Sequence, residues 1–153
     1  MSKNVITSNK NYTVGNATLF EFGILSSLMH MVWVKNVGGR LKSDFQYSTG
    51  MVYNNYPWPE NSTDKQKEAV EKGAQGVLDA RLQFPDSSLA NLYDPNIMPS
   101  ALVKAHQALD KAVDLCYRSQ PFTSETKRIE FLFELYDRYT AGLFVKEKKG
   151  RKK

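Results

Sequence analysis

The sequence predicts an α+β fold that is mostly α: one buried helix and a short β-hairpin, followed by a small antiparallel three-helix bundle. Three observations support this fold class. Residues 18–36 carry apolar side chains on every helical face, which is typical of a helix in the middle of a domain. Residues 40–53 change to strand-forming residues interrupted by turn residues. Residues 61–145 contain three stretches of helical periodicity joined by short linkers.

The predicted buried helix, residues 18–36, has two apolar faces. One face carries Phe20, Ile24, Leu28 and Met31, and the other carries Phe22, Leu25, Met29 and Trp33. The pair Gly38-Gly39 follows, and we expect it to end the helix with a left-handed cap and a turn. His30 lies among these apolar residues, so we expect a core histidine whose hydrogen bonds are satisfied.

The hairpin is expected within residues 40–53, with short strands at Phe45–Tyr47 and Met51–Tyr53. Residues 48–50 (Ser-Thr-Gly) form the turn between them. Two prolines then flank Trp58, and they forbid a helix and favour an extended segment. We expect Trp58 to hold this segment against the body of the protein.

The first helix of the predicted bundle begins at a capping box, because Thr63 and Gln66 have the spacing that this motif requires. The helix ends near Pro85. Gly73 and Gly76 lie inside it. Each glycine costs roughly 1 kcal/mol relative to alanine in a helix, so we expect another backbone to approach closely at this point.

The other two helices of the bundle have regular apolar stripes. The second begins near Pro99, which suits a first turn, and His106 and Asp110 lie four residues apart on it as an expected pair. The third is capped by Thr123 or Ser124. The stripes consist of Leu102, Ala105, Leu109, Ala112, Val113 and Cys116 in the second helix and of Ile129, Leu132, Phe133, Tyr136, Tyr139 and Leu143 in the third.

The composition fits a domain with a packed core. Of the 153 residues, 41% are hydrophobic and 24% charged, and the formal net charge is +5. Six positive charges lie in the tail of residues 146–153 (KEKKGRKK), so the rest of the chain is close to neutral. The tail is either a solvated, frayed end or an arm that binds phosphates without sequence preference. A DNA-binding face on the body would have to be a local patch.

Cysteine usage and the N-terminus predict a soluble, cytoplasmic protein. The single Cys116 cannot form an internal disulfide, and its place in an apolar stripe predicts a buried, inert thiol suited to a reducing compartment. No basic region followed by an apolar run indicates a signal peptide. The longest apolar stretch, Leu19–Val34, contains Glu21 and His30 and is too short to span a bilayer.

The motifs of several enzyme classes are missing from the sequence. There is no Gly-rich phosphate loop. His30 and His106 are far apart and accompany only one cysteine, so no zinc site can be drawn. Cys116 lies ten residues from His106, off its helical face, which argues against a nucleophilic pair. The Asn/Asp-Pro-Pro-aromatic motif that holds the target amine in adenine methyltransferases is also missing. We therefore expect no catalytic residue, no bound cofactor and no metal site in this chain.

A row of polar residues alternates along the predicted strand region. In a regular strand these residues share one face. Lysine can donate to guanine O6 and N7, and aspartate can accept from the cytosine amine, so such a face can read base edges. The hydroxyls that follow could bind phosphates. The candidate DNA-binding residues are Arg40, Lys42, Asp44, Gln46, Tyr47 and Ser48. An ordinary solvent-exposed strand face explains the same pattern.

Two sets of longer motifs occur in order along the chain. The first set consists of FGILSSLMHMVWV from Phe22, GRLKSDFQYS from Gly39 and VYNNYPWP from Val52. The second consists of LDAR from Leu78, SLANLYDP from Ser88, MPSALVKAHQALD from Met98 and VDLCY from Val113. The first set resembles the end of the target-recognition domain of type IIG/IIL restriction–modification enzymes, and the second resembles their helical C-terminal domain. Those enzymes fuse a nuclease, an adenine-specific methyltransferase and a recognition domain.

The resemblance implies a division of the chain and a function. Residues 1–16 form a flexible N-terminal segment, 17–60 the end of a target-recognition domain, 61–145 a helical C-terminal domain and 146–153 a basic tail. The expected function is recognition of double-stranded DNA for a site-specific methyltransferase, without catalysis by this chain alone. S-adenosylmethionine is expected in the full-length enzyme, and an upstream methyltransferase domain of the same or another chain is the expected partner. The alternative is a helical protein-interaction or assembly module without direct DNA contact.

We predict that this chain alone neither binds S-adenosylmethionine nor transfers methyl groups nor cuts DNA, because it lacks a cofactor loop and a catalytic motif. Calorimetric titration with S-adenosylmethionine should give no binding heat. A saturable heat with a dissociation constant in the micromolar range would contradict this prediction.

Overall fold

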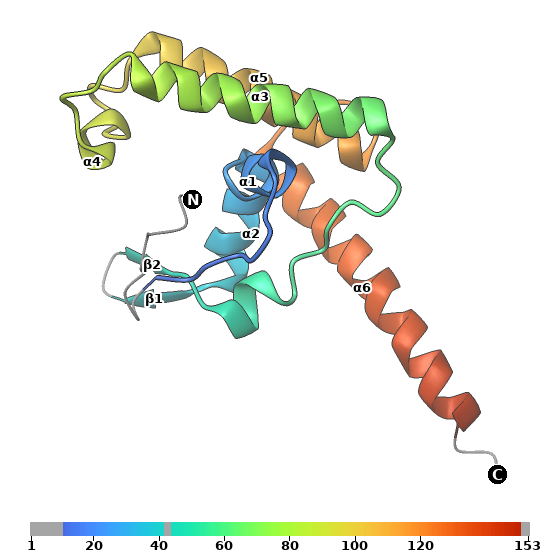
Figure 1. Ribbon diagram of the computed structural model, residues 1–153. Coiled ribbons are helices and arrows are strands. Elements are labelled where there is room, and N and C mark those ends of the chain that lie inside the picture. Colours follow the sequence, from blue (N-terminus) through green and yellow to red (C-terminus); the bar gives the residue numbers. More distant parts are fainter. Residues whose placement is uncertain (1–10, 42–43, 151–153) are drawn as a thin grey trace.

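The chain is mostly helical, and the computed structural model describes residues 11–41 and 44–150 (Figure 1). The elements in chain order are α1 (Leu19–Leu25), α2 (Leu28–Val37), β1 (Gly39–Leu41), β2 (Asp44–Gln46), the π-helix η1 (Thr49–Tyr53), α3 (Asp64–Leu82), α4 (Leu89–Leu92), α5 (Ser100–Tyr117) and α6 (Glu125–Gly150). None of the helices in the described ranges is long and apolar enough to cross a membrane.

The predicted α+β class is wrong, because helices account for nearly all the regular structure of the described residues. Extended structure is limited to the three-residue segments β1 and β2, which pair antiparallel with Gly39 opposite Gln46. The predicted hairpin is wrong as well, since Met51–Tyr53 lies in η1. Local hydrogen bonds explain the difference: the Met51 amide donates to the Ser48 hydroxyl over 3.1 Å, and the Asn54 amide donates to the Thr49 carbonyl.

Residues 18–36 form two helices rather than the single predicted helix. The side chain of Ser27 separates them: its hydroxyl donates to the Ile24 carbonyl over 2.6 Å and accepts from the His30 amide over 3.4 Å. The first contact terminates α1 and the second caps α2, as serine commonly does. Ile24 and Met29 are fully buried and Trp33 is 2% exposed, whereas Leu28 is only half-buried.

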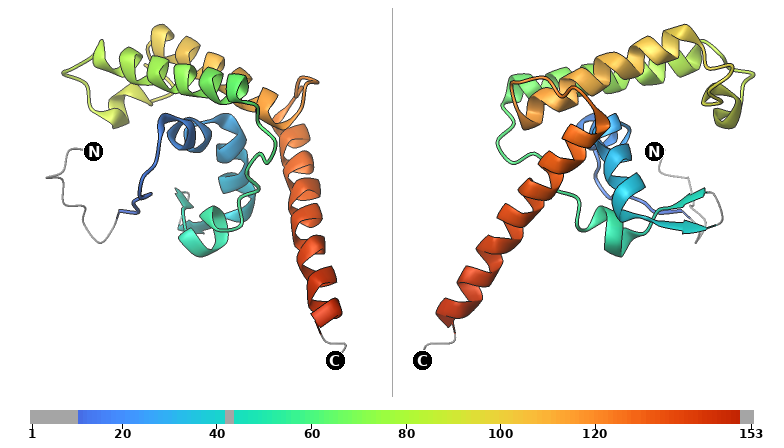
Figure 2. Two further views of the ribbon diagram at one scale, coloured as in Figure 1. Left: turned by 45° about the vertical axis from the view of Figure 1, so that its right-hand side comes forward. Right: turned by 180° about the vertical axis from the view of Figure 1, so that it is seen from behind.

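The predicted three-helix bundle is wrong because α6 leaves the other two helices. Figure 1 shows α3 and α5 side by side and antiparallel, while α6 extends away from them, and Figure 2 shows the same arrangement from two other sides. Near its start α6 packs against α2, where the rings of Phe133 and Tyr136 lie 5.7 and 6.0 Å from that of Trp33. Trp33 of α2 thus contacts the aromatic residues of α6 that the predicted bundle would have packed against the other two helices.

Two glycines allow the helices to approach closely. A Cβ at Gly23 of α1 would lie 2.6 Å from the Val70 side chain of α3, and a Cβ at Gly73 of α3 would lie 3.0 Å from the Leu109 Cα of α5. The close approach predicted at Gly73 is confirmed, whereas Gly76 has nothing within 4 Å. Gly38 was expected in a left-handed cap, but its φ is −68°.

Gly73 and Gly76, both in α3, offer a matched test of the packing between α3 and α5. Gly76→Ala should raise the free energy of unfolding by about 1 kcal/mol, because alanine is the better helix former and the space is open. Gly73→Ala should lower it, since overpacking against a backbone atom costs about 1–3 kcal/mol and offsets the same gain in propensity. Urea unfolding measures both. Equal stabilisation by the two substitutions would show that α3 and α5 are not in close contact at Leu109.

Candidate functional site

The predicted DNA-binding residues lie around the pair of short strands. β1 ends at Leu41 and β2 begins at Asp44, so Arg40 lies on one strand while Asp44 and Gln46 lie on the other. Alternation along one continuous strand therefore does not describe these residues. Lys42 lies outside the described residues. The side chain of Gln46 is exposed.

The two hydroxyls that follow β2 make hydrogen bonds within the protein. The Tyr47 hydroxyl lies 3.1 Å from Nε2 of His30. The Ser48 hydroxyl accepts from the Met51 amide, which leaves its own proton free for another acceptor. Neither arrangement follows from the sequence, because His30 lies 17 residues before Tyr47.

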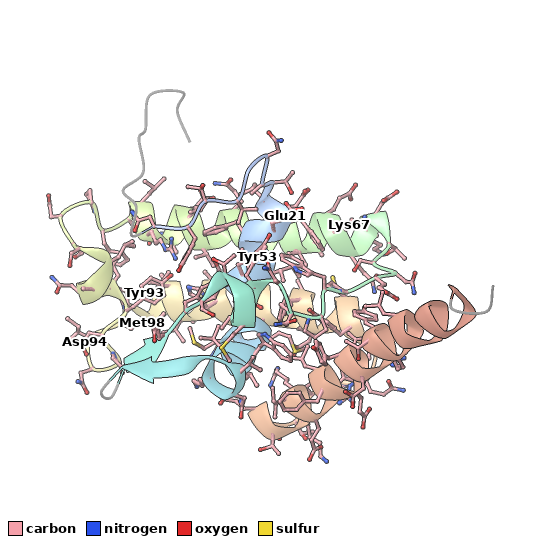
Figure 3. All side chains as sticks on the ribbon, turned by 90° about the horizontal axis from the view of Figure 1, so that it is seen from below. Glu21, Tyr53, Lys67, Tyr93, Asp94 and Met98 are labelled. Carbon is pink, nitrogen blue, oxygen red and sulfur yellow. The ribbon has the colours of Figure 1, made fainter. Side chains whose placement is uncertain are left out.

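A cavity of about 870 Å³ lies next to these residues and was missed by the sequence analysis. Its walls come from the segment before α1, from α1 and α2, and from the segment between β2 and the end of η1. The lining residues are Asn11, Tyr12, Thr13, Val14, Gly15, Leu25, His30, Tyr47, Thr49 and Tyr53. Tyr53 is labelled in Figure 3 beside the short helix η1 from which it comes. We call this space the His30 cavity. A lone histidine in an apolar helix was the one signal for it in the sequence.

Two residues that line the His30 cavity each have a polar atom that is buried away from it and has no hydrogen-bond partner among the described residues. These atoms are Nδ1 of His30 and Oγ1 of Thr49. His30 is 3% exposed, and burial lowers the pKa of its imidazole to about 4. The ring is therefore neutral at neutral pH. The described residues do not show a fully satisfied core histidine: one ring nitrogen lies within hydrogen-bond distance of the Tyr47 hydroxyl, and the other has no partner among them.

A second polar cluster, at the far end of α3 and α5, joins α4 to these helices. Arg81 donates from Nε and Nη2 to the Tyr93 hydroxyl, over 2.9 and 2.6 Å. That hydroxyl lies 2.6 Å from Nε2 of His106 and, since it already accepts twice, donates its proton to the ring. Burial and the neighbouring Arg81 lower the pKa of His106. These bonds connect α3, α4 and α5, so we interpret the cluster as structural.

The expected pair of His106 and Asp110 is wrong, because each binds another group. Asp110 accepts from the Leu28 amide over 2.7 Å and so ties the start of α2 to α5. Burial raises the pKa of Asp110, and the bond from the Leu28 amide opposes this rise. Its function is to orient α2, which carries His30.

The described residues suit neither a metal nor S-adenosylmethionine. They bring no three His, Cys, Asp or Glu side chains together. The described residues that line the His30 cavity include no carboxylate, whereas dinucleotide-binding folds place an acidic residue on the ribose and a Gly-rich turn at a parallel strand. The only strand pairing among the described residues is antiparallel.

Comparison with known proteins matches nearly the whole chain. The MmeI target recognition domain matches residues 1–60, and the MmeI C-terminal domain matches residues 62–144. A curated relative, DNA methyltransferase A of Bacillus subtilis (strain 168), is 44% identical over 135 residues, which are 88% of this chain and 15% of the relative. The solved structure of the type IIL restriction–modification enzyme MmeI in complex with DNA is 50% identical, with a TM-score of 0.79, over 82% of this chain and 17% of that one. This chain therefore spans about a sixth of the length of the relatives that it matches.

The buried His30 predicts a loss of stability in mild acid. Its pKa is about 4 in the folded chain and about 6.5 in an unfolded one, so the unfolded chain takes up the proton first. The contribution of neutral His30 to the free energy of unfolding is complete above about pH 6.5 and is lost as the pH falls toward 4. Lowering the pH from about 7.5 to 5.5 should therefore reduce the free energy of unfolding by roughly 1 kcal/mol. Urea unfolding at the two pH values measures this loss.

The variant His30→Phe is the control for this pH dependence, since it keeps His106 and the carboxylates but cannot titrate at position 30. Its free energy of unfolding should fall less between the two pH values than that of the unmodified chain. Identical pH dependence in the two proteins would show that His30 is accessible to protons in the folded state.

Proposed function

Because this chain belongs to the MmeI family, whose target recognition and C-terminal domains it matches, we propose that it reads a double-stranded DNA sequence for an adenine-specific methyltransferase of a restriction–modification system. The observation that carries this proposal is the likeness to the enzyme MmeI, whose structure was solved with DNA. At 50% identity and this TM-score, the matched parts of the two chains share their fold.

In this proposal the two regions of the chain have different functions. Residues 17–60 carry the groups that read bases, and residues 61–145 hold those groups in place. The packing of α1 on α3 and α5 at Gly23 and Gly73 supports this division, as does the bond from the Leu28 amide to Asp110. Rigid support of this kind improves the precision of a recognition site. Residues 1–16 lead into the recognition region.

Methyl transfer belongs to another part of the enzyme in this proposal. The cofactor S-adenosylmethionine and the catalytic groups would come from an upstream methyltransferase domain, in the same or another chain. The residues described here would position the DNA and would take no part in the transfer. The basic tail of residues 146–153 would add attraction to phosphates that is independent of sequence.

A second candidate function is assembly with a partner domain, and the end of the α3–α5 pair favours it. Three large apolar side chains are exposed around α4: Leu82 by 75%, Leu89 by 59% and Ile97 by 63%. Neighbouring exposed apolar groups often mark a protein contact. This function is compatible with DNA reading, and only sequence-selective DNA binding that weakens with salt would distinguish a reading module from a pure assembly module.

The residues proposed to read bases are tested by exchanging two charges. Lys42 and Asp44 are two positions apart in the sequence, and we expect both to contact one G·C pair, with the ammonium on guanine and the carboxylate on the cytosine amine. The double substitution Lys42→Glu with Asp44→Arg should change the preferred base, with about 1–3 kcal/mol at stake for each contact. Mapping of methylated sites in the complete enzyme gives the result.

The control is Lys149→Ala in the tail, which should weaken binding to all sequences alike and reduce the salt dependence. A double variant that keeps the original site and only loses activity would show that the two charges do not read bases. A double variant with unchanged sites and unchanged activity would favour the assembly function, in which this chain makes no direct contact with DNA.

A further inference from the structure

The strand pair β1–β2 projects from α2 (Figure 1) and is attached to this helix at both of its ends. β1 begins at Gly39, directly after Gly38, the residue that caps α2. β2 ends at Gln46, and the next residue, Tyr47, returns to α2 through its hydroxyl, which lies 3.1 Å from Nε2 of His30. Because His30 is the third of the ten residues of α2, the two attachments lie roughly 10 Å apart along the helix.

The attachment at the end of α2 would not by itself fix the direction of the strands. It consists of two successive glycines, Gly38 and Gly39, and glycine has the widest backbone freedom of all residues. A stiffer residue does not fit at the first position, because a Cβ at Gly38 would lie 2.6 Å from the Val34 carbonyl oxygen and 3.1 Å from that of Gln46. The direction of the strand pair therefore depends on the second attachment, at Tyr47.

The imidazole of His30 is itself held in place by the core. It is buried, and its ring packs edge-on against that of Tyr56, with centroids 4.5 Å apart. Tyr56 is buried too, and its hydroxyl lies 2.8 Å from that of Tyr117 in α5. The backbone of α2 is tied to the same helix by the bond from the Leu28 amide to Asp110. Nε2 of His30 is therefore presented to the end of β2 at a defined position.

Tyr47 contacts His30 through its ring as well as its hydroxyl. The two ring centroids are 5.7 Å apart and the rings are tilted by 50°, which is within the usual range for aromatic pairs. A ring contact and a hydrogen bond together restrict both the position and the rotation of the tyrosine side chain. Gln46 and Asp44 precede Tyr47 by one and three residues, so a displacement of Tyr47 would displace them as well.

We propose that His30 is a positioning residue for DNA recognition: by holding Tyr47, it sets the direction in which β2 presents Asp44 and Gln46 to base edges. The proposal rests on the proposed function, which assigns base reading to these residues. His30 touches no base and acts through Tyr47 alone. Base contacts need donors and acceptors held within about 0.5 Å of their correct places, whereas phosphate contacts dominate affinity. Loss of the His30–Tyr47 contact should therefore lower selectivity more than affinity.

The first experiment measures the direction of the strands in the whole chain without DNA. Residual dipolar couplings of the backbone amides give the orientation of β1 and β2 relative to α2. His30→Leu should lower the magnitude of the strand couplings, because the strands then move on the glycine joint, and should leave those of α3 and α5 unchanged. If His30→Leu does not fold, Tyr47→Phe removes the same hydrogen bond and takes its place. Strand couplings equal to those of the unmodified chain would overturn the proposal.

The chain offers a matched control and a conservative rescue. Tyr93 and His106 form a second tyrosine–histidine pair, 2.6 Å apart, which joins α4 to α5. His106→Leu removes that pair and should leave the strand couplings unchanged. His30→Gln keeps a hydrogen-bonding group near the position of Nε2 and should restore most of the coupling that His30→Leu loses. A His106→Leu variant that loses the strand couplings as His30→Leu does would show a general loosening of the fold and would contradict the proposal.

The second experiment measures selectivity in the complete enzyme, as the ratio of methylation at the recognised site to methylation at sites with one changed base pair. His30→Leu should lower this ratio by about 5- to 10-fold, a part of the discrimination that one base contact supplies, while His30→Gln and His106→Leu keep it. Adding Tyr47→Phe to His30→Leu should lower the ratio no further, because the contact is already lost. A further loss would mean that Tyr47 reads bases itself and would overturn an action through Tyr47 alone.

The two experiments together separate this proposal from the proposed function. If the exchange of Lys42 and Asp44 changes the methylated site but His30→Leu leaves the ratio unchanged, the positioning by His30 is overturned and the proposed function stands. If His30→Leu lowers the strand couplings but the unmodified enzyme shows no preference for any DNA sequence, the attachment of the strands by His30 is supported and the proposed function is contradicted.

Discussion

The close approach of α1 to α3 and α5 determines where the rest of the chain lies. Gly23 leaves no room for a side chain between α1 and the Val70 and Leu109 side chains, and Gly73 brings α5 onto α3 in the same way. The three helices therefore form one packed unit. The helices α2 and η1 and the strand pair are connected to that unit through α1 and through the bond from the Leu28 amide to Asp110. If α1 moved, then α2, the strand pair and η1 would move with it.

Trp33 connects α2 to η1 and to α6. Its indole Nε1 donates to the Val52 carbonyl of η1 over 3.0 Å, and its ring contacts Phe133 of α6. One buried side chain thus positions η1, which lines the His30 cavity, and also the start of α6. Tyr139 adds a second connection by donating to the Trp58 carbonyl over 2.7 Å.

Local signals predicted the helices of the second half, but long-range packing decided the arrangement. The capping box of Thr63 and Gln66 correctly starts α3, with the Gln66 amide donating to the Thr63 hydroxyl, and Cys116 is buried on the stripe of α5 as predicted. These features depend on residues three or four positions apart. The position of α6 depends on Trp33, about a hundred residues earlier, and no periodicity in α6 reveals that partner.

The π-helix was mistaken for a strand because strand-forming residues can also follow a serine cap. The six predicted DNA contacts remain predictions, and Thr49 was considered only as a phosphate contact in a turn.

The distribution of charge supports separate contributions to affinity and to specificity in the proposed DNA complex. The net charge of +5 is nearly accounted for by the tail of residues 146–153, so long-range attraction to phosphates would act mainly at the C-terminal end. Such attraction falls off within about 10 Å at moderate salt and carries no sequence information. A near-neutral body must then obtain its preference from short-range contacts, and these require groups held at fixed positions. The packing of α1 and α2 provides that rigidity beside β2 and the His30 cavity, whose described lining residues are uncharged. A site of this kind discriminates by shape and hydrogen bonding, and its selectivity should depend little on salt even where its affinity depends strongly on it.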